Sequence, residues 1–222
     1  MRVVVNAAMS VDGKLATRRR EQLRISGPAD FARVDRLRSE VDAVMVGVET
    51  VLADDPSLTV DDLDGLEDTE SPRPAAQPAR VVADSRGRTP TDARVLDDRA
   101  RSFVLVADAA SEDAVAALEA TGAEVVRAGD DRVELAAALA ELETRGIDSV
   151  LAEGGGELLF SLFEAGLVDE LSVYVGSFVI GGRDAPTLAD GEGFVDGFPS
   201  LELTGVEQLD DGVLLRYTVP AE

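Results

Sequence analysis

Residues 147–166 read IDSVLAEGGGELLFSLFEAG and join a strand pattern to a helix pattern through three consecutive glycines. Residues 147–152 are short, branched and apolar, which is typical of a buried strand. After the glycines, apolar residues recur at helical spacing up to Gly166, which is placed to end a helix. Free amides at a helix N-terminus suit a phosphate, but glycines also form ordinary turns that need a positive φ. The stretch therefore predicts a strand–turn–helix unit whose turn is a candidate ligand site.

Strands and helices of the same kind are expected on both sides of this unit. The strand patterns cover residues 2–8, 43–47, 81–84, 103–107, 124–127 and 168–175. The helix patterns cover residues 28–41, a short turn at 49–58, residues 111–121 capped by Ser111, and residues 133–144. Two further strands, 201–208 and 213–219, flank Asp210, Asp211 and Gly212, which is a hairpin signal.

This order of elements predicts an α/β fold. We expect a mostly parallel central sheet covered by helices on both faces, with an antiparallel hairpin at the C-terminal end. We also expect one domain over residues 1–222, because strand patterns resume directly after the acidic, proline-containing stretch 61–79. That stretch is therefore expected to be an exposed loop inside the domain.

The charge of the chain limits its partners. The formal net charge is −23, and Lys14 is the only lysine. Such acidity opposes binding to nucleic acid or to a membrane surface, where phosphates would be repelled. It fits the cytosol of an extreme halophile, where salt screens self-repulsion. No apolar run has the length of a membrane span and the first residues lack a signal-peptide pattern, so we expect a cytoplasmic protein.

The chain contains neither histidine nor cysteine. Disulfides, zinc sites built on these residues, Ser-His-Asp hydrolysis and histidine acid–base catalysis are therefore excluded. We expect no metal and favour an organic cofactor as the source of difficult chemistry. The chain has no GxGxxG pattern after its first strand, so a standard Rossmann dinucleotide site is not expected.

Ligands of α/β sheets bind beyond the carboxyl ends of the strands. The residues at those predicted ends are Ala7, Ala8, Gly47, Thr50, Asp54, Asp84, Ser85, Glu153, the three glycines that follow it, Gly181 and Gly182.

Several residues near these ends have more than one interpretation. Ser85, Arg86 and Arg88 could hold a nucleotide 2′-phosphate, because guanidinium binds phosphate oxygens bidentately, or could form an ordinary exposed turn. Glu153 could orient a polar ligand group or transfer a proton, or could cap the next helix. The solitary Lys14 could contact an anion, form an ion pair, or have no special role.

Four motifs occur together in the chain: VNAAMSVDGKLAT at 5–17, VDAVMVGVETVLADDPSLTV at 41–60, VVADSRGRTP at 81–90 and VLAEGGGELLFSLFEAGLVDELSVYVGSFVIGG at 150–182. In order and spacing they resemble the pyrimidine reductases of riboflavin biosynthesis, whose fold is similar to dihydrofolate reductase. The resemblance runs from about residue 3 to the final hairpin and is weak only in the acidic loop. It is more specific than the glycine triplet alone.

The resemblance implies an NADPH-dependent reduction of a ribosylaminopyrimidine 5′-phosphate to its ribitylamino counterpart, and a homodimer. It implies a three-layer dihydrofolate-reductase-like fold. The implied cofactor contacts are Ala8, Thr50, Asp54, Ser85 and the segment 155–161 with Gly155, Gly156, Glu157 and Leu158. The implied substrate contacts are Arg38, Leu58 and Glu153, with Lys14 as a candidate phosphate contact. We add Arg86 as the contact of the cofactor 2′-phosphate and Glu153 as the candidate catalytic residue.

Because these 222 residues have no histidine or cysteine for a zinc deaminase site, the resemblance points to the archaeal and fungal form that reduces the 2,5-diamino pyrimidinone. Asp61 is a departure, because bacterial relatives tend to place a basic substrate contact there. Phosphate recognition is then left to Arg38, Lys14 or another arginine. The alternatives are a reductase of another heterocycle or of the deaminated pyrimidinedione, and a nucleotide-binding module without catalysis.

Overall fold

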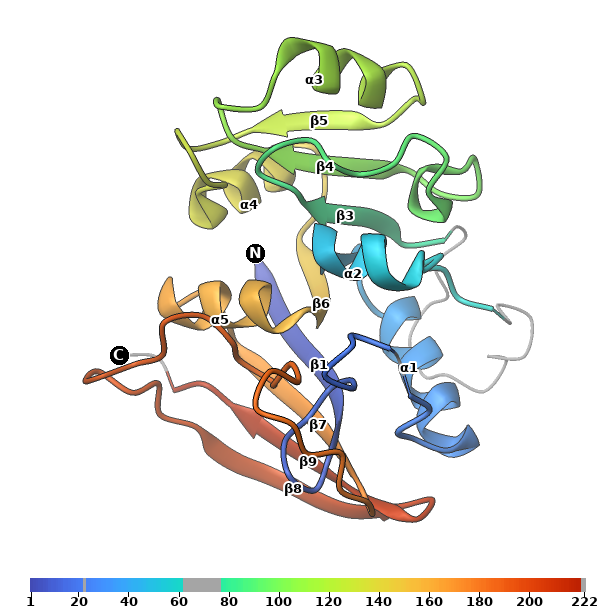
Figure 1. The fold of residues 1–222 in the computed structure, drawn as a ribbon, viewed down its shortest axis with the longest axis vertical. Coiled ribbons are helices and arrows are strands. Elements are labelled where there is room, and N and C mark those ends of the chain that lie inside the picture. The colour runs from blue at the N-terminus through green and yellow to red at the C-terminus, as the bar shows by residue number, and fades with distance from the viewer. Residues whose placement is uncertain (22, 62–76, 221–222) are drawn as a thin grey trace. The chain divides into compact units, whose positions relative to one another are not determined.

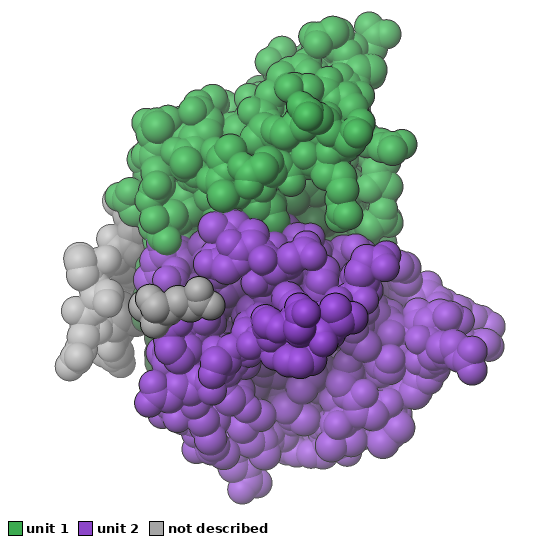
Figure 2. Space-filling view, turned by 90° about the vertical axis from the view of Figure 1, so that its left-hand side faces the viewer, with its two compact units in different colours: residues 1, 35–151 green, residues 2–34, 152–222 purple. Residues whose placement is uncertain are grey.

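The structure is a computed structural model that describes residues 1–21, 23–61 and 77–220. The chain divides into two compact units (Figure 2): unit 1 comprises residues 1 and 35–151, and unit 2 comprises residues 2–34 and 152–222. The helices and strands in chain order are β1 (Arg2–Ser10), α1 (Pro28–Ser39), β2 (Ala43–Gly47), α2 (Val48–Asp54), β3 (Ala79–Ala83), a 3-10 helix (Arg94–Leu96), β4 (Ser102–Val106), α3 (Glu112–Glu119), β5 (Glu124–Arg127), α4 (Leu135–Thr144), β6 (Ser149–Gly154), α5 (Gly156–Glu164), β7 (Glu170–Gly176), β8 (Glu202–Leu209) and β9 (Gly212–Thr218).

The nine strands form one sheet in the order β5-β4-β3-β2-β6-β1-β7-β9-β8 (Figure 1). The pairs β1–β7, β2–β3, β3–β4 and β4–β5 are parallel. Strand β9 pairs antiparallel with both β7 and β8. The structure thus confirms the α/β fold with a mostly parallel sheet and an antiparallel C-terminal hairpin.

Unit 1 is built on strands that are buried along their length. Residues 43–46 of β2 are at most 1% exposed, and residues 103–106 of β4 are fully buried. Parallel strands covered on both faces have continuous apolar sequences, which is why these strands were recognisable from residue type alone. The helices that follow have the expected caps: Ser111 Oγ accepts from the Ala114 amide at 3.2 Å, and the Glu134 carboxylate accepts from two amides of α4.

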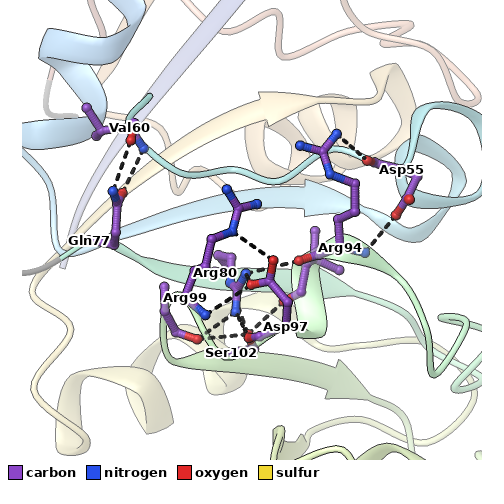
Figure 3. Close-up of polar contacts among 10 residues, drawn as sticks. Asp55, Val60, Gln77, Arg80, Arg94, Asp97, Arg99 and Ser102 are labelled. Atoms are coloured by element: carbon purple, nitrogen blue, oxygen red, sulfur yellow. Dashed lines mark hydrogen bonds and ion pairs between the residues drawn. The ribbon is translucent and has the colours of Figure 1, made fainter. Parts of the chain in front are cut away.

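A charged residue, Arg80, lies inside this core. Arg80 of β3 is fully buried, and its guanidinium is held by the segment that leads to β4 (Figure 3). It donates to Ser102 Oγ at 3.1 Å, to the Arg94 carbonyl at 3.0 Å, to Asp97 Oδ1 at 2.5 Å, and to the carbonyls of Asp97 and Ala100. With five hydrogen bonds, Arg80 fixes the 3-10 helix, which the sequence did not predict.

Unit 2 has its own buried polar network between α1 and the sheet. Arg33 of α1 donates to Asp30 at 2.8 Å, to Asn6 of β1 at 2.8 Å and to Ser172 of β7 at 3.0 Å. The N-terminus of α1 is capped from the β8–β9 turn, because the Asp210 carboxylate accepts from the amides of residues 29 and 30. These bonds fix α1 against the β1–β7 pair.

Several predicted boundaries differ from the structure. Helix α1 ends at Ser39 and not at residue 41, and α4 begins only at Leu135 because Glu134 is its N-cap. Strand β6 is shifted to Ser149–Gly154, so that Glu153 belongs to the strand. Of the acidic loop predicted at 61–79, residues 62–76 lie outside the described residues, and Ala79 already belongs to β3. Within the described ranges, no helix is long and apolar enough to cross a membrane.

Candidate active site

Helix α2 of unit 1 carries two of the predicted cofactor contacts. It follows β2 directly, with Gly47 as its N-cap, so Thr50 and Asp54 lie at the carboxyl end of that strand. Both residues are half-buried. Burial raises the pKa of the Asp54 carboxyl above its usual value, because the charged form loses hydration. Asp55 ends the helix in a left-handed conformation and accepts from the Arg94 amide at 2.8 Å (Figure 3).

The turn after β3 carries the predicted 2′-phosphate residues. Ser85 is half-buried, and its Oγ accepts from the Val133 amide at 3.0 Å, so this hydroxyl helps to hold the turn. Arg86 is exposed. Asp84 is fully buried, and its Oδ2 accepts from the Thr89 amide at 2.7 Å and from the Thr89 hydroxyl at 2.8 Å. The turn is therefore an ordered loop and presents Arg86 from a fixed backbone.

Three predicted or neighbouring residues of unit 1 meet beyond α2. Leu58 is buried and has φ of 55°, a left-handed conformation that is uncommon for leucine. The guanidinium of Arg38 donates to the carbonyl of Thr59 at 2.9 Å, which links the two predicted substrate residues through the backbone. The Thr59 hydroxyl is buried without a hydrogen-bond partner in the described chain. Strain and an unsatisfied polar group mark this segment as a candidate binding element.

The glycine turn of unit 2 decides between the interpretations of Glu153. The N-cap of α5 is Gly155, and no side chain caps this helix. The helix-capping interpretation of Glu153 is therefore wrong: Glu153 is half-buried near the carboxyl end of β6. In the first turn of α5, Glu157 is exposed, whereas the Leu158 side chain is buried and offers a ligand only its backbone.

The three glycines have different surroundings. Gly154 has φ of 135° and has nothing within 4 Å of the position that a Cβ would take. A Cβ on Gly156 would lie 2.4 Å from the Thr187 carbonyl oxygen and 2.7 Å from Asp190 Oδ2. The Asp190 amide also donates to the Gly156 carbonyl at 3.1 Å. At Gly156 it is therefore the chain's own segment 187–190 that approaches the backbone, while Gly154 leaves room for a ligand.

Lys14 lies on the same segment of unit 2. It pairs with Thr187 in an isolated antiparallel bridge, and its Nζ donates to the Ala185 carbonyl at 3.2 Å. Among the residues that the structure describes, it forms no salt bridge, so the ion-pair interpretation of Lys14 is not supported. Ala8 of β1 is half-buried, pairs with Tyr174 and packs on the cluster that contains it.

The structure thus brings the predicted residues together in two sets. In unit 1, α2 and the turn after β3 are joined by the contact of Glu49 with Arg88 at 2.6 Å. In unit 2, the segment 185–190 connects Lys14 with the glycine turn. Sequence reasoning missed Thr187 and Asp190, because their role depends on a contact with Gly156 that is distant in the sequence. It also missed Thr89 as the partner of Asp84.

The chain is similar in sequence to proteins of known family. The model of the RibD C-terminal domain matches residues 1–215. The chain belongs to the RibD C-terminal domain family. It is 45% identical over 210 residues to a 2,5-diamino-6-ribosylamino-4(3H)-pyrimidinone 5′-phosphate reductase of Archaeoglobus fulgidus, covering 95% of this chain and 94% of that protein. A protein of the same description from Methanothermobacter thermautotrophicus is 44% identical, with 98% and 97% covered.

Solved structures of this family have the same fold. The chain superposes on RibD of Acinetobacter baumannii with a TM-score of 0.79 and 26% identity, covering 99% of this chain and 58% of that one. It superposes on the yeast riboflavin biosynthesis reductase Rib7 with a TM-score of 0.70 and 17% identity, covering 99% and 90%. The second likeness shows the fold alone.

Proposed function

We propose that this chain is the archaeal-type reductase that converts 2,5-diamino-6-(5-phospho-ribosylamino)pyrimidin-4(3H)-one to its ribitylamino product in riboflavin biosynthesis, with NADPH as the reductant. The observation that carries this proposal is the 45% identity over 95% of the chain with the Archaeoglobus reductase. A reductase without histidine or cysteine agrees with it, because a nicotinamide cofactor, when bound, supplies the hydride.

We propose nine residues as cofactor contacts. The contacts are Ala8, Thr50, Asp54, Ser85, Arg86, Gly155, Gly156, Glu157 and Leu158. Backbone amides at the start of α5 suit the pyrophosphate, because a helix N-terminus favours anions. Gly154, with open space beside its Cα, is the point of closest approach that the turn allows. Arg86, exposed on an ordered turn, suits the 2′-phosphate and so supports NADPH over NADH.

The substrate phosphate is proposed to bind Arg38, Lys14 or another arginine. The Arg38 guanidinium is oriented by its bond to the Thr59 carbonyl, so little orientation entropy remains to be lost when a phosphate binds. The Lys14 ammonium has three donors. Among the described residues its one hydrogen bond is to the neutral Ala185 carbonyl, so no carboxylate there matches its charge. The Leu58 side chain is buried, so Leu58 would contact the substrate through its backbone.

Glu153 is the proposed catalytic residue. A carboxylate at the end of β6 can accept hydrogen bonds from the amino groups of the pyrimidine or from the sugar hydroxyls. It would thereby align the imine or carbonyl carbon of the opened ribose with the reductant, and alignment is the main requirement of hydride transfer. Product formation also consumes one proton, which water supplies, and the Glu153 carboxylate orients that water by accepting its hydrogen bond.

The catalytic role is tested by Glu153→Gln, which keeps the size of the side chain and removes its charge. We expect kcat to fall by about 100-fold, within the range for loss of a positioned acid or base. Glu164→Gln, an exposed change at the end of α5, is the matched control and should retain full activity. If Glu153→Gln kept full activity, Glu153 would have no part in the mechanism.

A homodimer is also proposed, with the outer face of the β8–β9 hairpin as the interface. The register places Leu203, Val206 and Val213 on one face of the hairpin, and they are 54%, 62% and 37% exposed. Strand β8 is at the edge of the sheet, and this face carries no charge in a chain of net charge −23. An exposed apolar face at an open edge favours a second copy as its cover.

The interface is tested by Val206→Lys in light-scattering measurements of molar mass. We expect the wild-type protein to have the mass of a dimer and Val206→Lys to have the mass of a monomer. Val11→Lys is the control: Val11 is 61% exposed and lies outside the hairpin, so this variant should remain dimeric. A monomeric wild type would contradict the proposal. The surplus of carboxylates supports a cytoplasm of high salt, where self-repulsion is screened.

A further inference from the structure

Two arginines project from the turn after β3, and that turn is held rigidly. The Gly87 amide donates to the Asp84 carbonyl at 3.1 Å, and the Asp84 carboxylate binds both polar groups of Thr89. Gly87 has φ of 67°, and a Cβ there would lie 3.1 Å from Ala114 Cβ of α3, so the turn packs closely on that helix. The backbone from which the Arg86 and Arg88 side chains extend therefore has little freedom to move.

The two arginines differ in their partners. Arg86 forms no hydrogen bond or ion pair with any residue that the structure describes. Arg88 Nη1 lies 2.6 Å from Glu49 Oε1, and its Nε lies 3.9 Å from Asp84 Oδ1. Glu49 is in the first turn of α2, adjacent in sequence to Thr50. The charge of Arg88 is thus matched by two carboxylates, whereas the charge of Arg86 is not.

We infer that Glu49 is a specificity-determining residue, which holds Arg88 away from a bound 2′-phosphate and so limits the preference for NADPH over NADH. This inference rests on the proposed function, because it requires that the turn at 84–89 receives the cofactor 2′-phosphate. Arg86 then provides most of the discrimination between NADPH and NADH. Arg88 is a second arginine that binds the 2′-phosphate only when Glu49 releases it.

Because the ion pair of Arg88 with Glu49 is exposed, a bound 2′-phosphate can compete with Glu49 for Arg88. The side chains of Arg88 and Glu49 are 47% and 52% exposed, so water and salt weaken their attraction. A 2′-phosphate carries nearly two negative charges and matches the guanidinium fork, so it competes well for Arg88. The Glu49 carboxylate opposes this because it occupies the Arg88 guanidinium. NADH lacks the phosphate, so its binding does not depend on whether Arg88 is released.

The test replaces Glu49 by glutamine and measures kcat/KM for NADPH and for NADH with the diamino substrate. We expect the NADPH-to-NADH ratio of Glu49→Gln to rise by about three- to ten-fold, the scale of one partly exposed charge-assisted contact. Arg88→Ala alone should change the ratio by less than about two-fold, because Arg88 is already neutralised. Arg86→Ala should lower it by about ten-fold, the loss of a charge-assisted contact.

The double variant Glu49→Gln/Arg88→Ala separates the mechanism from simple repulsion. If Glu49 acts through Arg88, the gain disappears in the double variant; an equal gain there would overturn the inference, as would an unchanged ratio in Glu49→Gln. Glu112→Gln, which breaks the exposed pair with Arg127 at 2.7 Å, is the matched control and should leave the ratio unchanged.

A binding measurement makes the result independent of turnover. By calorimetry, adenosine 2′,5′-bisphosphate should bind Glu49→Gln more tightly than wild type by the same three- to ten-fold, while AMP should bind both equally. Equal gains for both nucleotides would overturn the inference. A wild-type protein that oxidises neither nicotinamide nucleotide would instead refute the proposed function, so the two failures are distinguishable.

Discussion

Replacing Gly156 by alanine tests the contact between the glycine turn and the segment 187–190. The added Cβ would lie 2.4 Å from the Thr187 carbonyl oxygen, and a backbone oxygen cannot rotate away as a side chain does. An unstrained contact needs about 3.4 Å, so the segment must move by roughly 1 Å. Overpacking of this kind costs about 1–3 kcal/mol. For a chain of this size, each kcal/mol lowers Tm by about 2–4 °C.

The functional effect should exceed the effect on stability. Thr187 pairs with Lys14, so displacing the segment moves a proposed phosphate contact together with the cofactor turn. We expect KM to rise by about ten-fold for both substrates, which is less than the roughly 100-fold loss of rate that a 1 Å misplacement of reacting groups can cause. Gly166→Ala is the matched control, because Gly166 has φ of 64° but nothing within 4 Å of an added Cβ. It should lower Tm by strain without changing KM. Wild-type Tm and KM in Gly156→Ala would show that the segment 187–190 does not constrain the glycine turn.

Three further predictions concern stability and charge. Arg80→Met should lower the free energy of unfolding by about 3 kcal/mol in denaturant titrations, because it leaves buried acceptors without a donor. Arg99→Met, at an exposed partner of the same Asp97, should cost less than about 1 kcal/mol; equal losses would contradict this. Burial, and then the hydrogen bond to Asp211, raise the pKa of Tyr174 from 10.0 to about 12. The folded chain keeps a proton that the unfolded chain loses, so stability should fall as pH rises from about 10 to 12, and Tyr174→Phe should flatten this slope in unfolding experiments; an unchanged slope would count against it. Finally, the KM for NADPH should fall as KCl is raised, because the net charge of −23 repels an anionic cofactor until salt screens it; a KM that rose with salt would be inconsistent.

The fold was predictable from sequence because local signals agree with the final structure. The buried strands β2 and β4 are continuous apolar runs, and Ser111 caps α3 as its position indicated. The predicted start of the helix at residue 133 was wrong because Glu134 is the N-cap of α4, so the helix begins only after it. The 3-10 helix at 94–96 was missed because it depends on Arg80, a charged residue inside a strand.

The candidate site was predictable in part. Topology placed Glu153 and Thr50 at strand ends, and the turn chemistry of Ser85 and Arg86 was visible in sequence. The roles of Gly156, Thr187 and Asp190 were not, because they come from a contact across about thirty residues that no local pattern encodes. The same holds for Glu49, whose partner Arg88 lies on another element. The residue roles and the single-domain description stay predictions.

We propose above that this chain reduces the diamino pyrimidinone ribosyl phosphate with NADPH. The most direct test is NADPH oxidation by the purified protein, followed by absorbance in high salt on addition of that substrate. We expect loss of NADPH in equal amount to the ribitylamino product formed, with slower turnover of the deaminated pyrimidinedione. No loss of absorbance at saturating substrate would contradict it, and nucleotide binding without oxidation would indicate a non-catalytic module.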